Sequence, residues 1–219
     1  MIGTRLRLLL LLFAPGLLAV APSAAAVEPD APGFSLRLRS GVGLPAGDQD
    51  DQHELSETYG VLVPIDLEAG WFVVPRLFLG AHGSFGILTI AGDACGEPLE
   101  CSGTHFRFGA AAEYRFDVQK SFEKWASLGV GYEIARFAIE RSGAKASRVD
   151  AGPEYLQAQI GGDFMLEGGF SVGPFLGASL GEFRTATLHQ ADGTHTTYAI
   201  DDPKLHQWYL IGVRGGWTP

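Results

Sequence analysis

The sequence is poor in cysteine, in charge and, after its first 26 residues, in long apolar runs. Two of its 219 residues are cysteine, and charged residues make up 19%, below the typical value of about 25%. Acidic residues outnumber lysine and arginine by 25 to 16, which gives a formal net charge of −9. This acidity argues against a nucleic-acid partner, because phosphate binding needs a basic face. No stretch of the mature chain approaches the roughly 18 consecutive apolar residues of a transmembrane helix, so none is expected.

Glycine and apolar side chains, in contrast, are plentiful. Glycine accounts for 30 of the 219 residues, about twice its average frequency of about 7%. Hydrophobic residues make up 46% of the chain and aromatic residues 11%, a composition that argues against disorder. The apolar residues are spread along the whole chain, which differs from a soluble protein that gathers them in one core.

The N-terminal segment, residues 1–26, has the three-part organisation of a secretory signal peptide. Two arginines give a positive start, an apolar run follows from Leu8 to Val20, and three alanines precede Val27. We predict cleavage before Val27, so that residues 27–219 form one exported domain. An uncleaved membrane anchor is the alternative, for which the apolar run is short compared with a span of about 20 residues.

Most of the mature chain alternates between apolar and polar residues with a period of two, the pattern of β-strands with two different faces. The clearest case is the segment 104–118. Its even positions are almost all apolar, and its odd positions are mostly charged or histidine. The odd positions are His105, Arg107, Gly109, Ala111, Glu113, Arg115 and Asp117. An amphipathic helix does not produce this pattern.

The same alternation predicts eight strands. They span residues 33–44, 59–73, 76–90, 104–118, 124–140, 152–166, 170–185 and 204–217. Tight turns alternate with long loops, which cover residues 45–58, 91–103, 142–151 and 186–203. We expect a β-bulge near Arg136, where the alternation breaks, and the phase of the strand at 170–185 stays open. An even number of long antiparallel strands with loops of alternating length predicts an all-β, up-and-down transmembrane barrel.

The alternation does not say which face points into the barrel, and a soluble barrel such as a lipocalin, with its apolar face inside, is the alternative. Charges of both signs collect on the polar face in nearly equal number, as expected of a lumen closed by ion pairs. The predicted lumen network consists of Arg37, Arg39, Asp66, Glu68, Arg107, Glu113, Arg115, Glu133, Asp163 and Arg214. An outer aromatic girdle is expected at the turn-side strand ends, formed by Trp71, Tyr114, Phe116, Trp125, Tyr132 and Trp217. These features favour a membrane barrel with its apolar face outward.

Glycine-spaced strand segments carry a family resemblance. They are Leu128-Gly129-Val130-Gly131-Tyr132-Glu133, Gly173-Pro174-Phe175 and Ile211-Gly212-Val213-Arg214-Gly215. With these segments the chain resembles the small eight-stranded outer-membrane β-barrel proteins of the OmpA/OmpX-like class over residues 33–217. The resemblance implies a role as a structural anchor, an adhesin, a narrow pore or, rarely, a lipid-modifying enzyme. Such barrels often end on an aromatic residue that the assembly machinery reads, whereas Trp217 is followed here by Thr218 and Pro219.

The two cysteines, Cys95 and Cys101, fall in the second long loop. In an exported chain, two nearby cysteines predict a disulfide, which would stabilise this short loop by about 2 kcal/mol. A metal or redox pair is the alternative, although two thiols alone make a poor zinc site.

The first long loop contains an acidic stretch, residues 47–57, without a basic residue. Its carboxylates suit Ca²⁺ or Mg²⁺, but His53 stands where an EF-hand loop requires glycine. A solvated acidic loop is the interpretation we adopt, with bridging cations shared with lipopolysaccharide phosphates as a hypothesis. No metal ligand and no cofactor-binding residue is assigned.

His82 and Ser84 lie two residues apart, so that both side chains share one strand face. The resemblance implies an alternative activity here, because outer-membrane lipid A deacylases are eight-stranded barrels with a His-x-Ser pair that supplies base and nucleophile. Their motif continues with asparagine, where this chain has Phe85. The predicted phase also points His82 and Ser84 into the lumen rather than toward lipid. A hydrogen-bonded lumen pair is the interpretation we adopt, and no catalytic residue is assigned.

Together these observations predict a non-enzymatic integral outer-membrane barrel with a structural or surface-interaction role, acidic outer loops and a lumen plugged by ion pairs. The alternatives are a narrow pore for ions or small solutes and a lipid A-modifying esterase. The expected partners are outer-membrane lipid and lipopolysaccharide, with the barrel assembly machinery during insertion. The loops carry no motif that identifies a surface ligand.

Overall fold

The computed structural model describes residues 33–49, 54–91, 95, 99–116, 118, 120–141 and 143–219. The predicted signal peptide, residues 1–26, lies outside the described residues, as do Asp117 and the part of the acidic stretch that contains His53. Within the described ranges, no helix combines the length and the apolar character that a membrane span requires.

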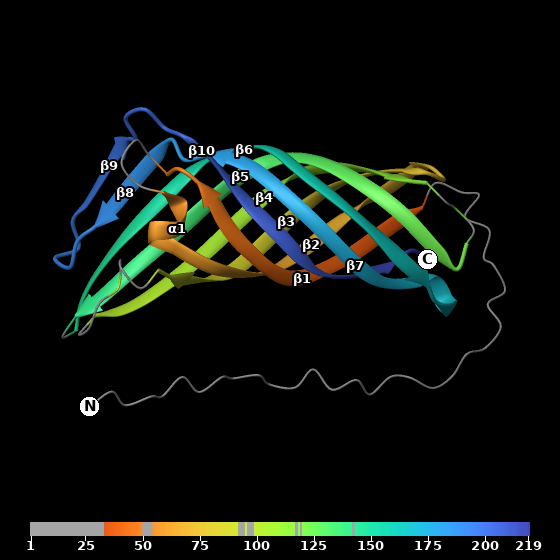
Figure 1. Ribbon diagram of the computed structural model, residues 1–219, viewed down its shortest axis with the longest axis horizontal. Helices are drawn as coiled ribbons and strands as arrows, with labels where there is room; N and C mark the ends of the chain where they lie inside the picture. The colour runs from red at the N-terminus through yellow and green to blue at the C-terminus, as the bar shows by residue number, and fades with distance from the viewer. Residues whose placement is uncertain are drawn as a thin grey trace.

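Eight long antiparallel strands of the described chain close into a barrel (Figure 1). They are β1 (Phe34–Gly47), β2 (Tyr59–Val74), β3 (Leu77–Ile90), β4 (Glu100–Arg115), β5 (Phe122–Arg141), β6 (Ala144–Met165), β7 (Phe170–Glu182) and β10 (Leu205–Trp217). The strands pair in chain order, and β10 pairs with both β7 and β1, which closes the sheet. The predicted fold class, an all-β eight-stranded antiparallel barrel, is confirmed.

The two ends of the barrel carry different connections (Figure 1). A hairpin of β8 (Thr185–His189) and β9 (His195–Ala199) pairs with the beginning of β6. This hairpin and the short helix α1 (Leu55–Thr58) lie at one end, which we call the loop end. The opposite turn end carries the β2–β3 turn, the 3-10 helix η1 (Glu167–Gly169) and the C-terminus.

Two of the expected long loops contain strand. The segment 142–151 belongs to a long hairpin, because β5 continues to Arg141 and β6 begins at Ala144. The segment 186–203 contains most of β8 and all of β9, and β8 pairs with residues 147–151 of β6. This pairing satisfies backbone groups that an isolated hairpin would leave to solvent. Alternation between polar and apolar residues is limited to short stretches of these segments, such as Thr185–His189, so the sequence pattern does not reveal the strands.

The irregularity of the barrel lies in β6. The sequence places a bulge near Arg136, and this is wrong, because the pairing of β5 with β4 and β6 runs unbroken through Arg136. The pairing of β6 with both of its neighbours shifts around Tyr155 instead. Tyr155 and Leu156 are therefore both on the outside, 40% and 41% exposed. The extra residue lets Glu154 and Gln157 both point into the barrel.

The apolar face of the strands points out of the barrel. The outward side chains of Leu38, Ile65 and Ile87 are 54%, 56% and 62% exposed, whereas Arg37 and Glu113 inside are 2% and 1% exposed. A soluble barrel of the lipocalin type has the reverse arrangement. An outward apolar band around a polar interior is the arrangement of a transmembrane barrel.

The structure also determines the phase of β7. Its inward side chains include Ser171, Phe175 and Ser179, and its outward ones include Val172 and Leu176. The inward face carries no charge and holds the apolar Phe175. The contrast between faces that marks the other strands is therefore too weak in β7 to assign its phase from the sequence.

Aromatic side chains are exposed on the outside of the turn end. They include Trp71, Tyr114, Phe116 and Trp217. Two girdle assignments are wrong. Trp125 points into the lumen and is 1% exposed, and Tyr132 lies in the middle of β5 rather than at its turn-side end.

Candidate functional site in the barrel lumen

The turn-side half of the lumen holds a group of buried charges, which we call the ionic network: Arg37, Glu113, Arg115, Glu123, Asp163 and Arg214. Glu113 on β4 accepts hydrogen bonds from Arg37 on β1, at 2.9 Å, and from Arg214 on β10. Arg214 also donates to Asp163 on β6. Arg115 donates to Glu123 at 2.8 Å. Since β4 is a neighbour of neither β1 nor β10, the bonds from Arg37 and Arg214 to Glu113 bridge the bore of the barrel.

Aromatic rings inside the lumen support two of the guanidinium groups. Arg37 lies over Phe78 with 3.6 Å between Cζ and the ring centroid, and Arg214 lies over Trp125 at 3.6 Å. The indole Nε1 of Trp125 donates to Asp163 at 3.1 Å. Trp125 is therefore part of the lumen network rather than of the outer girdle. Cation–π contacts and charge-assisted hydrogen bonds hold the same arginines.

The middle of the lumen is polar but less completely paired. Arg39 contacts Glu68 at 3.6 Å. Arg107 donates to Glu154 at 3.2 Å and lies 4.0 Å from Asp66. Several buried polar atoms here have no hydrogen-bond partner among the described residues, and they include Arg39 Nε, His82 Nε2, Ser84 Oγ and Arg107 Nε. Ordered water is the usual partner of such buried groups.

His82 and Ser84 on β3 both point into this middle section, as the predicted phase requires, and each is 5% exposed. The hydrogen bond expected between them is absent, because neither His82 Nε2 nor Ser84 Oγ has a partner among the described residues. A serine nucleophile needs a base within hydrogen-bond reach and access to its substrate. Ser84 has no hydrogen bond to His82 as a base, and its position inside the barrel gives it no access to a lipid substrate.

A carboxylate between two histidines marks the loop-side part of the polar lumen. His105 Nε2 lies 3.2 Å from one oxygen of Glu133, and His206 Nε2 contacts the other. The three side chains are at most 1% exposed. The His105 ring packs on Trp208 with 5.3 Å between centroids, and the His206 ring stacks on Phe183 at 4.3 Å. The two histidines thus lie between the polar middle of the lumen and the apolar side chains nearer the loop end.

The loop-side half contains a group of buried, mostly apolar side chains that we call the apolar cap: Leu55, Tyr59, Leu62, Leu88, Phe183 and Trp208. None of them is more than 2% exposed. Leu55 comes from α1, so this helix contributes a buried side chain to the apolar cap. The Tyr59 hydroxyl donates to Asp150 Oδ2 at 3.0 Å, and Gln49 Nε2 donates to the same oxygen at 3.0 Å. These bonds connect the first loop and the beginning of β2 to β6.

All ten residues of the predicted lumen network lie inside the barrel and are buried. Glu133 differs from the expectation in its partners, which are two histidines rather than an arginine. Sequence reasoning missed Glu123, Trp125 and Glu154 as lumen residues. Glu123 precedes the predicted strand start, and Glu154 precedes the bulge, so the alternation assigns it to the wrong face. The sequence does contain one signal for Glu154: a charged residue stands at a position that the alternation of residues 156–166 assigns to the apolar face.

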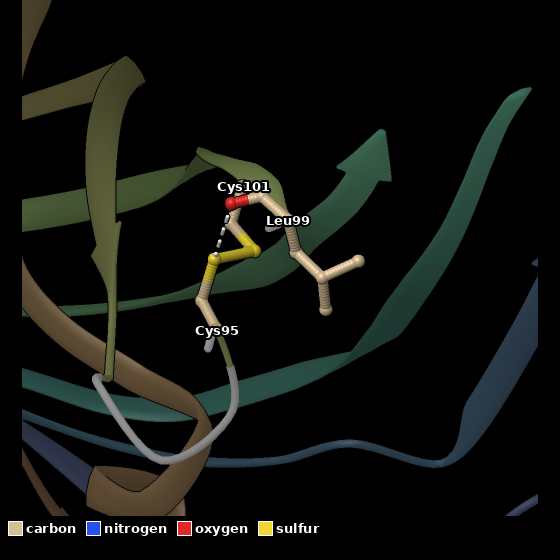
Figure 2. The surroundings of a disulfide bond; sticks show 3 residues. All are labelled: Cys95, Leu99 and Cys101. Atoms are coloured by element: carbon tan, nitrogen blue, oxygen red, sulfur yellow. Dashed lines mark hydrogen bonds between the residues drawn. A yellow bond between two sulfur atoms is a disulfide. The ribbon is translucent and has the colours of Figure 1, made fainter. Parts of the chain in front are cut away.

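The predicted disulfide is confirmed. Cys95 and Cys101 are bonded, with 6.1 Å between their Cα atoms, in the connection between β3 and β4 (Figure 2). The Sγ of Cys95 also lies 3.7 Å from the carbonyl oxygen of Leu99 (Figure 2). The bond closes a small loop at the loop end of the barrel.

No protein-family model and no curated protein sequence matches this chain. Among solved structures, it is similar to a major outer membrane protein from Thermus thermophilus, with 14% identity and a TM-score of 0.52 over 86% of this chain and 100% of the other. It is also similar to the outer membrane protein OprG from Pseudomonas aeruginosa, with 13% identity and a TM-score of 0.50 over 85% and 97% of the two chains. At these identities the likeness concerns the fold. The resemblance to small outer-membrane barrels is thereby confirmed at the level of the fold.

Proposed function

We propose that this protein is an integral outer-membrane barrel with a closed lumen and a non-enzymatic, structural or surface-interaction role. The observation that carries the proposal is the inversion of its two faces, apolar outside and charged inside. In water the outer face would exceed the apolar patches of a few hundred Å² that soluble monomers expose. In lipid the same face is solvated, and a closed sheet leaves no unpaired edge in the hydrocarbon.

Two groups of side chains support a closed lumen. An eight-stranded barrel has an interior just wide enough for side chains. The ionic network crosses the bore near the turn end, and the apolar cap fills it near the loop end. A passing ion would have to break charge-assisted hydrogen bonds and then enter an apolar region, and both steps are unfavourable.

A narrow pore is the second candidate, because the middle of the lumen contains polar atoms without protein partners among the described residues. Water at Arg39, His82 and Arg107 would provide a polar path between the two closed sections. Conduction would then require the cap to move. Leu55 is well placed to do so, since a four-residue helix rather than a barrel strand carries it.

The surface-interaction role is assigned to the loop end. There β8 and β9 add a hairpin to the sheet, and β9 is the open edge of the described sheet. Acidic residues are frequent in the loop-end segments, namely Asp48, Glu54, Glu57, Asp192, Asp201 and Asp202. Divalent cations bridge carboxylates to phosphates. We therefore expect lipopolysaccharide and other outer-membrane lipid as partners, with residues 1–26 directing export and the barrel assembly machinery inserting the chain.

Two measurements test this proposal. Protein extracted from membranes with detergent is expected to change its gel mobility on boiling, as closed barrels do, and to give no discrete conductance in planar bilayers. Steady discrete conductance would contradict a closed lumen and support the narrow pore. A protein without its leader that stays monodisperse in detergent-free buffer would overturn the membrane location.

A separate experiment tests the proposal that the protein is not an enzyme. Lipid A from cells that express the protein is expected to keep all its acyl chains, because His82 and Ser84 lie inside the barrel. Mass spectrometry of extracted lipid A gives this result directly. Loss of an acyl chain that disappears with Ser84→Ala would show esterase activity and contradict the proposal.

A further inference from the structure

The β8–β9 hairpin carries two histidines side by side near its tip. His189 ends β8, His195 begins β9, and the two are paired directly across the hairpin. Their ring centroids lie 5.9 Å apart, with 30° between the ring planes. Both side chains are exposed, and the hairpin lies at the loop end of the barrel (Figure 1). The two imidazoles are therefore both accessible and close to each other.

The turn between the two strands holds this pair in register. The Gln190 amide donates to the Thr194 carbonyl at 2.9 Å, and the Gly193 amide donates to the Gln190 carbonyl at 3.1 Å. Gly193 has a φ of +87°, which glycine adopts without strain. Since Gln190 and Thr194 form a hydrogen-bonded pair, the adjacent histidines occupy a non-hydrogen-bonded position. Side chains approach each other most closely at such positions.

The next pair of side chains on the same face of the hairpin is joined by a hydrogen bond. The hydroxyls of Thr187 and Thr197 are 2.9 Å apart and share a hydrogen bond on the same face. On its other side β8 pairs with β6, where His189 lies opposite Ser147. The strand that carries one of the two histidines is thus fixed between two neighbours, which reduces the entropy lost on binding a ligand.

We propose that His189 and His195 together bind one divalent transition-metal ion, Cu²⁺, Ni²⁺ or Zn²⁺. Imidazole is a preferred ligand of all three ions. Two imidazole nitrogens at about 2.0–2.1 Å from the ion place the ring centroids about 5 Å apart around a tetrahedral ion, and about 4.5 Å apart at adjacent positions of a square-planar one. The observed separation of 5.9 Å lies within about 1.5 Å of both values, and rotation of the two exposed side chains can bring a nitrogen of each ring to the ion.

The two histidines leave the remaining coordination positions to water or to a ligand from outside. Throughout the described ranges, no group of three or more His, Cys, Asp or Glu side chains is arranged to hold a metal ion. The pair therefore forms an open surface site, unlike the closed four-ligand sites of structural zinc. Cu²⁺ is expected to bind more tightly than Ni²⁺ or Zn²⁺, as it does at nitrogen sites in general.

Titration of the detergent-solubilised protein, without an affinity tag, with Cu²⁺ alone tests this site. Wild type is expected to bind one Cu²⁺ per chain by calorimetry and to show two coordinated nitrogens by electron paramagnetic resonance. H189Q and H195Q are each expected to weaken binding by about tenfold or more, because the second imidazole acts at a high effective concentration. Each variant should keep at most one coordinated nitrogen.

H53Q is the matched control, because it removes the histidine of the acidic stretch and leaves the hairpin pair in place. It is expected to bind Cu²⁺ as wild type does, and gel mobility before and after boiling verifies that every variant forms the barrel. Absence of binding by wild type, equal affinity of wild type and H189Q, or one ion shared between two chains would overturn the site.

Discussion

The two halves of the lumen contain side chains of opposite chemistry. On the turn side, Arg37, Glu113 and Arg214 join strands that are not neighbours through charge-assisted hydrogen bonds. On the loop side, apolar side chains fill the bore, and two of them, Leu55 and Phe183, lie outside the barrel strands. Closure of the barrel itself therefore positions the ionic network, whereas the cap also requires the loop-end segments to fold onto the mouth.

The two halves also differ in what a single substitution removes. In the ionic network, loss of one partner leaves the other charge buried with fewer compensating partners, which costs more than the pair contributes. In the cap, truncation removes the transfer free energy of the deleted atoms and leaves a cavity whose cost falls when neighbours collapse into it. We therefore expect the network to be the more sensitive half.

Arg214→Ala is expected to have the largest effect. It leaves Glu113 and Asp163 without their shared partner, and loss of a buried partner costs about 3–5 kcal/mol of unfolding free energy. Urea unfolding in detergent micelles, followed by tryptophan fluorescence, measures this loss.

Arg184→Ala is the matched control, because it removes an ion pair with Glu182 in which the arginine is 59% exposed. Its unfolding midpoint is expected to stay at the wild-type value, since exposed pairs contribute little. Equal losses for the two variants would mean that the buried network has no special role in stability.

Trp208→Ala tests the apolar cap. Trp208 is fully buried against His105, and its truncation is expected to cost about 3 kcal/mol, the lower end of the range for buried tryptophan because the loop end can partly refill the space. Trp71→Ala, which truncates a tryptophan that is 60% exposed on the outside, provides the comparison in the same urea experiment. A larger loss for Trp208→Ala than for Arg214→Ala would reverse the order of the two halves.

The ionic network could be predicted from the sequence because the alternation is regular in the middle of the barrel strands. Arg37, Glu68 and Arg107 each stand between two apolar residues, so their face follows from a period of two. The partners within the network could not be predicted, since they depend on which strands face each other across the bore. Trp125 was assigned to the girdle by its aromatic character, although its buried indole donor has an acceptor in the lumen, at Asp163.

The apolar cap could not be found from the sequence. Leu62 lies between Val61 and Val63, so the segment is a continuous apolar run in which polarity does not distinguish inside from outside. Leu88 and Trp208 are likewise apolar residues on the lumen face of their strands. The contribution of α1 depends on a loop that folds inward, and such tertiary placement leaves no periodic signal.

Removal of the disulfide is expected to lower the unfolding free energy by a smaller amount and to affect only the loop end. Replacing both Cys95 and Cys101 by serine is expected to cost at most about 2 kcal/mol, because the loop that the bond closes is short. The barrel should still form, as judged by its change in gel mobility on boiling. Urea unfolding of wild type with and without reductant checks the same quantity without substitution. A loss as large as that of Arg214→Ala would show that this loop supports the whole barrel rather than its rim.

The turn of the β8–β9 hairpin should show the smallest effect, confined to the loop end. Hydrogen bonds from the hydroxyl and the amide of Thr194 lower the pKa of Asp192 below its ordinary value. The turn is therefore fully stabilised above the ordinary carboxyl pKa of about 4, and this contribution is lost as the pH falls through the lowered pKa. The protection factor of the Thr194 amide against hydrogen exchange is expected to stay constant from about pH 6 down to about pH 4 and to fall below that in wild type. Asp192→Asn, which keeps an acceptor oxygen but does not titrate, should remove this pH dependence. If amides in the middle of β1 and β4 lost protection over the same range, the acid response would belong to the whole barrel, and the separation between its two ends would be wrong.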